Sequence, residues 1–127
     1  MNFPFDRDQG LILVTTRIDG PVGTRYLMLA LDTGATTTLI NVERLVALGY
    51  DPAVSNDRTR ITTGSGLEFA TIVPLLKVTA LGKERSAFRV IAHTLPPSAG
   101  VDGLLGLDFL RGGRLSLDFT TGLIQFS

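Results

Sequence analysis

The order of apolar and polar residues along the chain predicts a series of short β-strands. The β-branched run at residues 11–18 ends at an Asp-Gly turn, and a second run covers residues 25–31, so the two segments are expected to pair as a hairpin. Further strand-like segments, most of them bounded by glycine or proline turns, are 58–63, 67–73, 75–80, 86–92, 114–118 and 123–126. Because short strands dominate and helical patterns are few, we expect an all-β fold that forms a closed barrel or a sandwich.

One segment changes from strand-like to helical spacing. Val42, Leu45 and Val46 recur at the interval of one helical face. Asn41 precedes them as a suitable N-cap, and Gly49 follows at a position where helices often end. We therefore expect a short helix between Asn41 and Gly49.

The most informative stretch is an apolar run, residues 27–31, that ends in the single carboxylate of Asp32. A charge at the end of a buried strand is costly unless it is hydrogen-bonded or functional. Thr33 and Gly34 follow, and a glycine lets the backbone N–H approach the carboxylate without interference from a Cβ. Asp-Thr-Gly is also ordinary turn chemistry at the end of a strand, so the tripeptide alone does not decide between a turn and a catalytic site.

Composition limits the kinds of protein that this chain can be. A length of 127 residues suits one domain, 1–127, with a sizeable core. Twelve basic and twelve acidic residues balance, so charge does not favour nucleic acid or an anionic membrane surface. The absence of cysteine excludes disulfides and thiolate sites, and the single His93 cannot build a histidine-rich metal site. With no signal-peptide pattern and no apolar run of membrane-spanning length, we expect a soluble, cytoplasmic protein without metal or cofactor.

Three motifs in order resemble the retropepsin-like aspartic proteases, the single-lobed relatives of pepsin that include retroviral proteases and bacterial homologues. The resemblance covers roughly residues 11–126. Asp32-Thr33-Gly34-Ala35 resembles the family's Asp-Thr-Gly-Ala signature, Gly64-Ser65-Gly66 lies where the family has its flap hairpin, and Leu104-Leu105-Gly106 resembles its second glycine motif, with a short helix expected at 107–110. The resemblance implies a closed acid-protease-like barrel of short strands, with one or two short helices and one lobe per chain.

The resemblance also implies an aspartic endopeptidase that hydrolyses peptide bonds in a peptide or protein substrate. That chemistry uses two carboxylates, one ionised and one protonated, because like charges about 3 Å apart cannot both ionise; the aspartic-protease dyad is the established example. The chain has one Asp-Thr-Gly and no Asp-Ser-Gly. A homodimer would supply the second carboxylate by placing Asp32 of each subunit at the two-fold axis.

By resemblance, Asp32 is the catalytic residue, and Thr33, Gly34 and Ala35 form the active-site loop. In that family the threonine bonds across the dimer, and the glycine offers its backbone to the carboxylate and the substrate. The residues that would contact substrate are Thr36, Thr37, Gly64, Ser65, Gly66 and Leu104.

The chain departs from the retroviral pattern at the substrate cleft and at the second glycine motif. Retroviral members have acidic residues where this chain has Thr36 and Thr37, and an arginine where it has Leu107. Dimer and substrate contacts can therefore differ. The apolar segment 123–126 could join a sheet between subunits, as chain ends do in the family. A catalytically inactive retropepsin-like module that dimerises or holds a peptide is the main alternative function.

Other readings of the same residues are weaker. A serine hydrolase built on Ser65 and His93 lacks the Gly-x-Ser-x-Gly spacing, and the glycines of 100–106 lack the spacing and lysine of a phosphate-binding loop. Asp102 and Asp108 could suggest a metal, but a turn and a packing contact explain them more simply.

Overall fold

The computed structural model describes residues 1–63 and 66–127. Gly64 and Ser65, which were predicted to form the tip of the flap, lie outside the described residues. The strands are β1 (Asn2–Pro4), β2 (Leu13–Gly20), β3 (Gly23–Leu31), β4 (Leu39–Asn41), β5 (Arg58–Thr63), β6 (Gly66–Ala80), β7 (Lys83–His93), β8 (Gly103–Leu105), β9 (Leu115–Asp118) and β10 (Leu123–Phe126). The helices are α1 (Val42–Ala47) and α2 (Leu107–Leu110), with 3₁₀ turns η1 (Pro52–Val54) and η2 (Pro97–Ala99).

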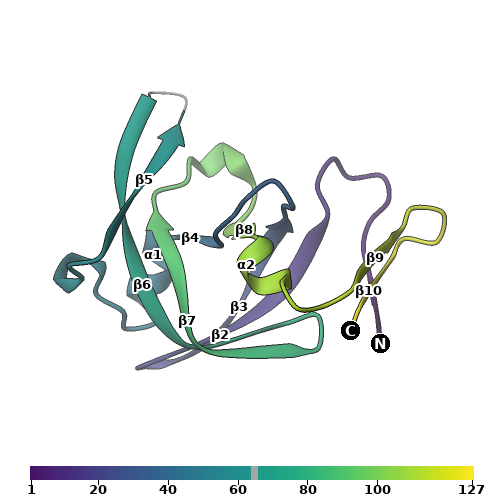
Figure 1. The fold of residues 1–127 in the computed structure, drawn as a ribbon, viewed down its shortest axis with the longest axis horizontal. Coiled ribbons are helices and arrows are strands. Elements are labelled where there is room, and N and C mark those ends of the chain that lie inside the picture. The colour runs from purple at the N-terminus through teal and green to yellow at the C-terminus, as the bar shows by residue number, and fades with distance from the viewer. Residues whose placement is uncertain (64–65) are drawn as a thin grey trace.

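A closed barrel forms the body of the molecule (Figure 1). Its sheet has the order β2-β3-β8-β4-β7-β6-β5, and a further pairing of β2 with β6, centred on Ile18 and Val78, closes it. β5 pairs only with β6, so the β5–β6 hairpin projects beyond the barrel at the upper left of Figure 1. The expected all-β, single-lobed, closed barrel is confirmed.

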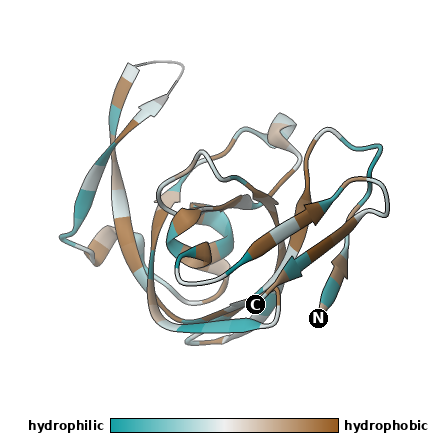
Figure 2. Ribbon diagram, turned by 45° about the vertical axis from the view of Figure 1, so that its right-hand side comes forward, coloured by the Kyte–Doolittle hydropathy of each residue, from teal (hydrophilic) through white to brown (hydrophobic). Residues whose placement is uncertain are grey.

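The barrel interior follows the two-residue period of its strands. In β2, Val14, Thr16 and Ile18 are buried while the residues between them are exposed, because successive side chains point to opposite faces. The same alternation gives the broken bands of hydrophobic residues along the strands in Figure 2. The fully buried side chains include Leu29, Ile40, Leu45, Leu75, Val90, Leu105 and Phe109.

Helix α1 forms as the sequence predicts. The Asn41 side chain accepts a hydrogen bond from the N–H of Glu43 at 3.3 Å, which caps the first turn. Gly49, at φ +93°, follows the last turn, and Leu45 and Leu48 bury the inner face of this segment in the core. Among the described residues, neither α1 nor α2 is long and apolar enough to cross a membrane.

The structure corrects the predicted break between residues 73 and 75, because β6 runs unbroken through Pro74. Ile72 and Leu76 donate their N–H groups away from β7, to Asp57 O at 2.8 Å and Tyr50 Oη at 2.9 Å. The nitrogen of Pro74 falls on that same side, which has no strand partner between Thr71 and Lys77. A residue without an N–H is tolerated there.

The connection between β6 and β7 is also shorter than predicted. Only Leu81 and Gly82 form the turn, both with positive φ, +51° and +75°. This backbone geometry is that of two-residue hairpin turns whose twist matches the flanking strands.

The chain ends form a separate three-stranded sheet, β1-β10-β9, on the right of Figure 1. β1, which pairs with β10 through Phe3 and Ile124, was not predicted from the sequence. The outer edge of β9 has no strand partner within the described chain. In this structure the chain ends therefore pair with each other inside one protomer.

Candidate active site

Asp32 follows directly after β3 and is held by the loop that it begins. Its N–H donates to Leu105 O at 3.0 Å, which continues the pairing of β3 with β8. Its carboxylate Oδ1 accepts the Gly34 N–H at 2.9 Å, and its carbonyl accepts the Ala35 N–H at 3.2 Å. A Cβ on Gly34 would lie 3.2 Å from that Oδ1, so glycine suits this close approach. The half-buried carboxylate is thus fixed in one orientation.

The second glycine motif lies against the Asp32 loop. The Leu107 N–H donates to Ala35 O at 2.8 Å. A Cβ on Gly106 would meet Ala35 O at 2.8 Å and the carbonyl carbon of Thr37 at 3.0 Å, so a side chain at Gly106 would force the two backbones apart. The two predicted motifs, far apart in sequence, form one structural unit.

A buried threonine ties this unit together. Thr38 is fully buried, and its N–H lies 3.0 Å from both carboxylate oxygens of Asp108. The Thr38 hydroxyl donates to Asp108 Oδ1 at 2.7 Å and accepts the Gly106 N–H at 3.0 Å. We name these three residues the Thr38 junction. Thr38 was not among the predicted site residues; the available signal was a hydroxyl placed directly before the apolar pair Leu39-Ile40.

The other predicted site residues fall into three groups. Thr33 and Thr36 are exposed on the loop, and the Thr33 side chain has no hydrogen-bond partner among the described residues. Thr37 and Leu104 are half-buried. Gly66 begins β6 and pairs with Thr63, while Gly64 and Ser65 lie outside the described residues.

Strand register places the residues around Asp32 on one face of the sheet. Ala30 is opposite Leu104, Leu104 is opposite Leu39, and Leu39 is opposite Ile91. Because side chains two residues apart share a face, Asp32 belongs to the same face as Ala30. We call this surface the Asp32 face; its central side chains are apolar, as the wall of a peptide-binding cleft requires.

The aspartates considered as metal ligands have other partners. The Asp102 carboxylate accepts the Met28 N–H at 2.9 Å and binds the Arg44 guanidinium at 3.0 Å, and Asp108 belongs to the Thr38 junction. In the part of the chain that the structure describes, no group of three or more potential metal ligands comes together. His93 Nε2 lies 3.3 Å from Glu68 Oε2. The contact of this histidine with a glutamate gives no support to the serine-hydrolase alternative.

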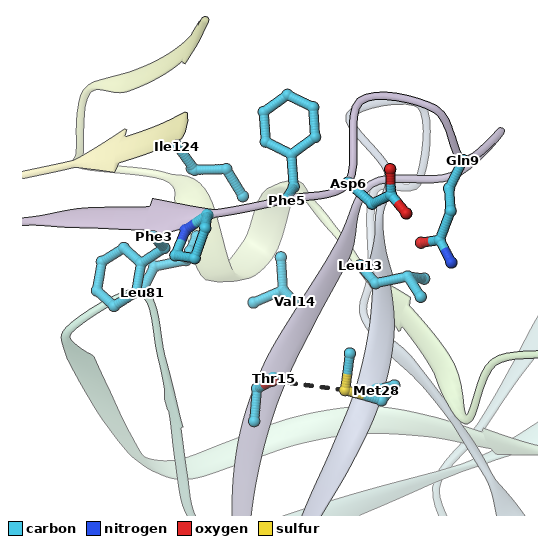
Figure 3. Close-up of a pocket in the computed structure, with 11 residues that line it drawn as sticks. Phe3, Phe5, Asp6, Gln9, Leu13, Val14, Thr15, Met28, Leu81 and Ile124 are labelled. Carbon is cyan, nitrogen blue, oxygen red and sulfur yellow. Dashed lines mark hydrogen bonds between the residues drawn. The ribbon is translucent and has the colours of Figure 1, made fainter. Parts of the chain in front are cut away.

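A separate apolar pocket lies under the N-terminal segment. It has a volume of about 410 Å³, and Figure 3 shows Phe3, Leu13, Val14 and Ile124 among its lining residues. Asp32 is not one of the residues that line it. The pocket and the candidate active site are therefore different places on the molecule.

A closed barrel with one Asp-Thr-Gly loop buttressed by a second glycine motif defines a single-lobed protein of the acid-protease class. The family described as gag-polyprotein putative aspartyl protease matches residues 15–112, a span that contains both motifs. The chain therefore belongs to this retropepsin-like family of aspartic proteases.

The solved structures include a close match in fold. The crystal structure of a retropepsin-like aspartic protease from Rickettsia conorii superimposes with a TM-score of 0.74, covering 99% of this chain and 89% of that one. The sequences are 20% identical, so this likeness supports the fold and leaves the residue roles to other arguments. No curated protein sequence matches the chain.

Proposed function

We propose that the protein is an aspartic endopeptidase that acts as a homodimer, with Asp32 of each subunit forming the catalytic pair. The observation that carries this proposal is the Asp32 carboxylate, oriented by the Gly34 N–H at 2.9 Å at the end of a barrel strand. The family assignment supports the chemistry. One Asp-Thr-Gly in the chain supports the need for a second copy.

In the proposed mechanism the ionised Asp32 takes a proton from a shared water, which attacks the scissile carbonyl. The protonated Asp32 of the second copy donates a hydrogen bond to the developing oxyanion. The Asp32 that took the proton then gives it to the leaving amine nitrogen as the C–N bond breaks. Each carboxylate is held before substrate arrives, so little reorganisation is needed at the reacting atoms.

The remaining loop residues have positions that suit their proposed roles. Thr33 is exposed, so its hydroxyl could donate a hydrogen bond across the dimer. Thr36 and Thr37 would contact substrate. Leu104, on the Asp32 face, would form part of the apolar wall. The β5–β6 hairpin, which begins its second strand at Gly66, would be the flap over the bound peptide.

A digest of a peptide library by wild type and Asp32→Asn tests the proposal. We expect wild type to cleave and Asp32→Asn to lose activity by about a thousandfold or more, because an amide cannot take the proton from water. Asp8→Asn, which makes the same change at an exposed carboxylate, is the matched control and should retain activity.

Two outcomes would count against the proposal. Cleavage at the wild-type rate by Asp32→Asn would remove Asp32 from the mechanism. A wild-type protein that dimerises and binds peptides without cutting them would support the inactive peptide-binding module instead.

A further inference from the structure

Glu68 and His93 lie next to each other where the Asp32 face meets the β5–β6 hairpin. On β6, Ile72 is opposite Ile91, and steps of two residues along the strand lead from Ile72 to Glu68. On β7, one such step leads from Ile91 to His93. His93 Nε2 and Glu68 Oε2 lie 3.3 Å apart, which confirms that the two side chains share this face.

The pair stands out because the surface leading to it is apolar. Leu104, Leu39, Ile91 and Ile72 follow one another across the sheet, and Ile61 lies opposite Glu68 on the hairpin. The Glu68 side chain is 42% exposed, so its carboxylate is still open to a ligand. His93 is 25% exposed and lies beneath it at the end of β7.

Two arginines on neighbouring elements already have ion-pair partners. Arg89, two positions before Ile91, forms an ion pair with Asp57 next to β5. Asn41, opposite His93, precedes the helix that carries Arg44, whose guanidinium binds Asp102 at 3.0 Å.

Arg60 belongs to β5 of the hairpin, but its side chain lies on the other face. It is opposite Phe69, on the reverse face from Glu68, and its guanidinium carbon is 5.7 Å from the Phe69 ring centroid. Glu68 and His93 therefore set the net charge at this end of the Asp32 face.

We propose that Glu68 is a specificity residue that selects peptides with a basic side chain at the position lying against the base of the β5–β6 hairpin, and that His93 competes for the same carboxylate. This inference rests on the proposed peptide-binding cleft. A lysine or arginine of the peptide would reach along the apolar wall with its methylene groups and place its charge on Glu68. A peptide with an apolar side chain of equal length would gain only the first of these contacts.

The contact with His93 occupies part of the Glu68 carboxylate. Because His93 Nε2 lies 3.3 Å from Glu68 Oε2, a basic side chain of the peptide would have to share or displace this contact. Removing the imidazole should therefore increase the preference for a basic side chain.

The test uses pairs of peptides that differ only in lysine against norleucine at one position, scanned along the peptide. Cleavage by wild type gives the ratio of kcat/KM for the lysine peptide to kcat/KM for the norleucine peptide. Fluorescence anisotropy with the Asp32→Asn variant gives the corresponding ratio of binding affinities. Because both peptides are measured at the same pH, an effect of pH on the catalytic pair is the same for both and does not change the ratio. At about pH 8 we expect one position to favour lysine about fivefold in wild type, the scale of one partly exposed ion pair, and less in Glu68→Gln.

Three further variants separate charge from structure. Glu68→Asp should keep part of the preference, because it keeps the carboxylate. Glu84→Gln makes the same change at an exposed glutamate near the opposite end of β7 and should leave the ratio unchanged. His93→Ala should increase the lysine preference, because it leaves the whole Glu68 carboxylate to the peptide.

The outcomes distinguish this inference from the proposed function. If wild type and Glu68→Gln both cleave and have the same ratio of kcat/KM for lysine against norleucine at every position, the inference is overturned and the proposed endopeptidase activity still holds. Lysine-selective binding that needs Glu68, in a protein that never cleaves, supports the inference and overturns the endopeptidase. Failure of Asp32→Asn to bind any peptide of the set overturns the inference.

Discussion

Replacing Thr38 with valine tests whether the Thr38 junction holds the catalytic loop. Valine keeps the shape and burial of the side chain but removes its hydroxyl. The Asp108 carboxylate then loses a donor at 2.7 Å, and the buried Gly106 N–H loses its acceptor at 3.0 Å. Both losses occur at a residue with no exposed surface, so water cannot replace the hydroxyl.

The expected destabilisation follows from these two contacts. A hydrogen bond to a charged group contributes about 1.5–3 kcal/mol, and a buried donor without an acceptor costs about 1–3 kcal/mol. Because the Asp108 carboxylate keeps the N–H groups of Thr38 and Phe109 as donors, we expect a net loss of about 2–4 kcal/mol in the free energy of unfolding. A domain of this size has about 5–15 kcal/mol in total, so the change is large.

Urea denaturation at one fixed protein concentration measures the effect, since the stability of a dimer would depend on concentration. Thr79→Val is the matched control: Thr79 is a half-buried threonine in β6 whose hydroxyl makes no hydrogen bond among the described residues, and its replacement should change stability by less than about 0.5 kcal/mol. In the double variant with Asp108→Asn, the loss of stability should be smaller than the sum of the losses in the two single variants, because both residues share one contact. Equal stability of the Thr38 and Thr79 variants would refute the reasoning.

Two other predictions concern association and acid stability. Sedimentation velocity should show a dimer under conditions of full peptidase activity, because one Asp-Thr-Gly per chain supplies half of the catalytic pair; an active, strictly monomeric species would contradict the shared site. The Thr120 hydroxyl, with the N–H groups of Thr120 and Thr121, lowers the pKa of Asp118 below its ordinary value, so its stabilisation is present above that value and is lost as pH falls through the lowered one. The melting-temperature difference between wild type and Asp118→Asn should therefore be constant near neutral pH and shrink below about pH 4; a difference that does not change with pH would contradict this assignment.

The strands and the first helix were predictable because their information is local. Alternation of buried and exposed residues in β2 and the cap at Asn41 each depend on residues within one element. Pro74 misled the prediction because its tolerance depends on which edge of β6 lacks a partner, a property of the assembled sheet. β1 was missed because three residues that end in proline carry little strand signal by themselves.

The contacts that complete the candidate site could not be predicted in the same way. Thr38 and Asp108 are 70 positions apart, and no pattern in either segment indicates that they meet. The Glu68–His93 pair depends on strand register, since a shift of one residue in β6 would turn Glu68 to the opposite face. The Asp32 loop itself was predictable, because the carboxylate and the glycine that orients it are two positions apart.

One protomer supplies the contacts that shape the Asp32 loop but only one of the two carboxylates that the proposed reaction needs. Within one protomer, the Asp32 carboxylate accepts the Gly34 N–H, and the β3–β8 pairing and the Thr38 junction support the loop from behind. The proposed reaction, in contrast, needs a second carboxylate that one protomer lacks. If the loop keeps this shape when two subunits meet, little ordering of the loop opposes dimer formation. Activity would then follow the concentration of dimer, and changes at the Thr38 junction would reduce turnover within the dimer as well as the stability of the protomer.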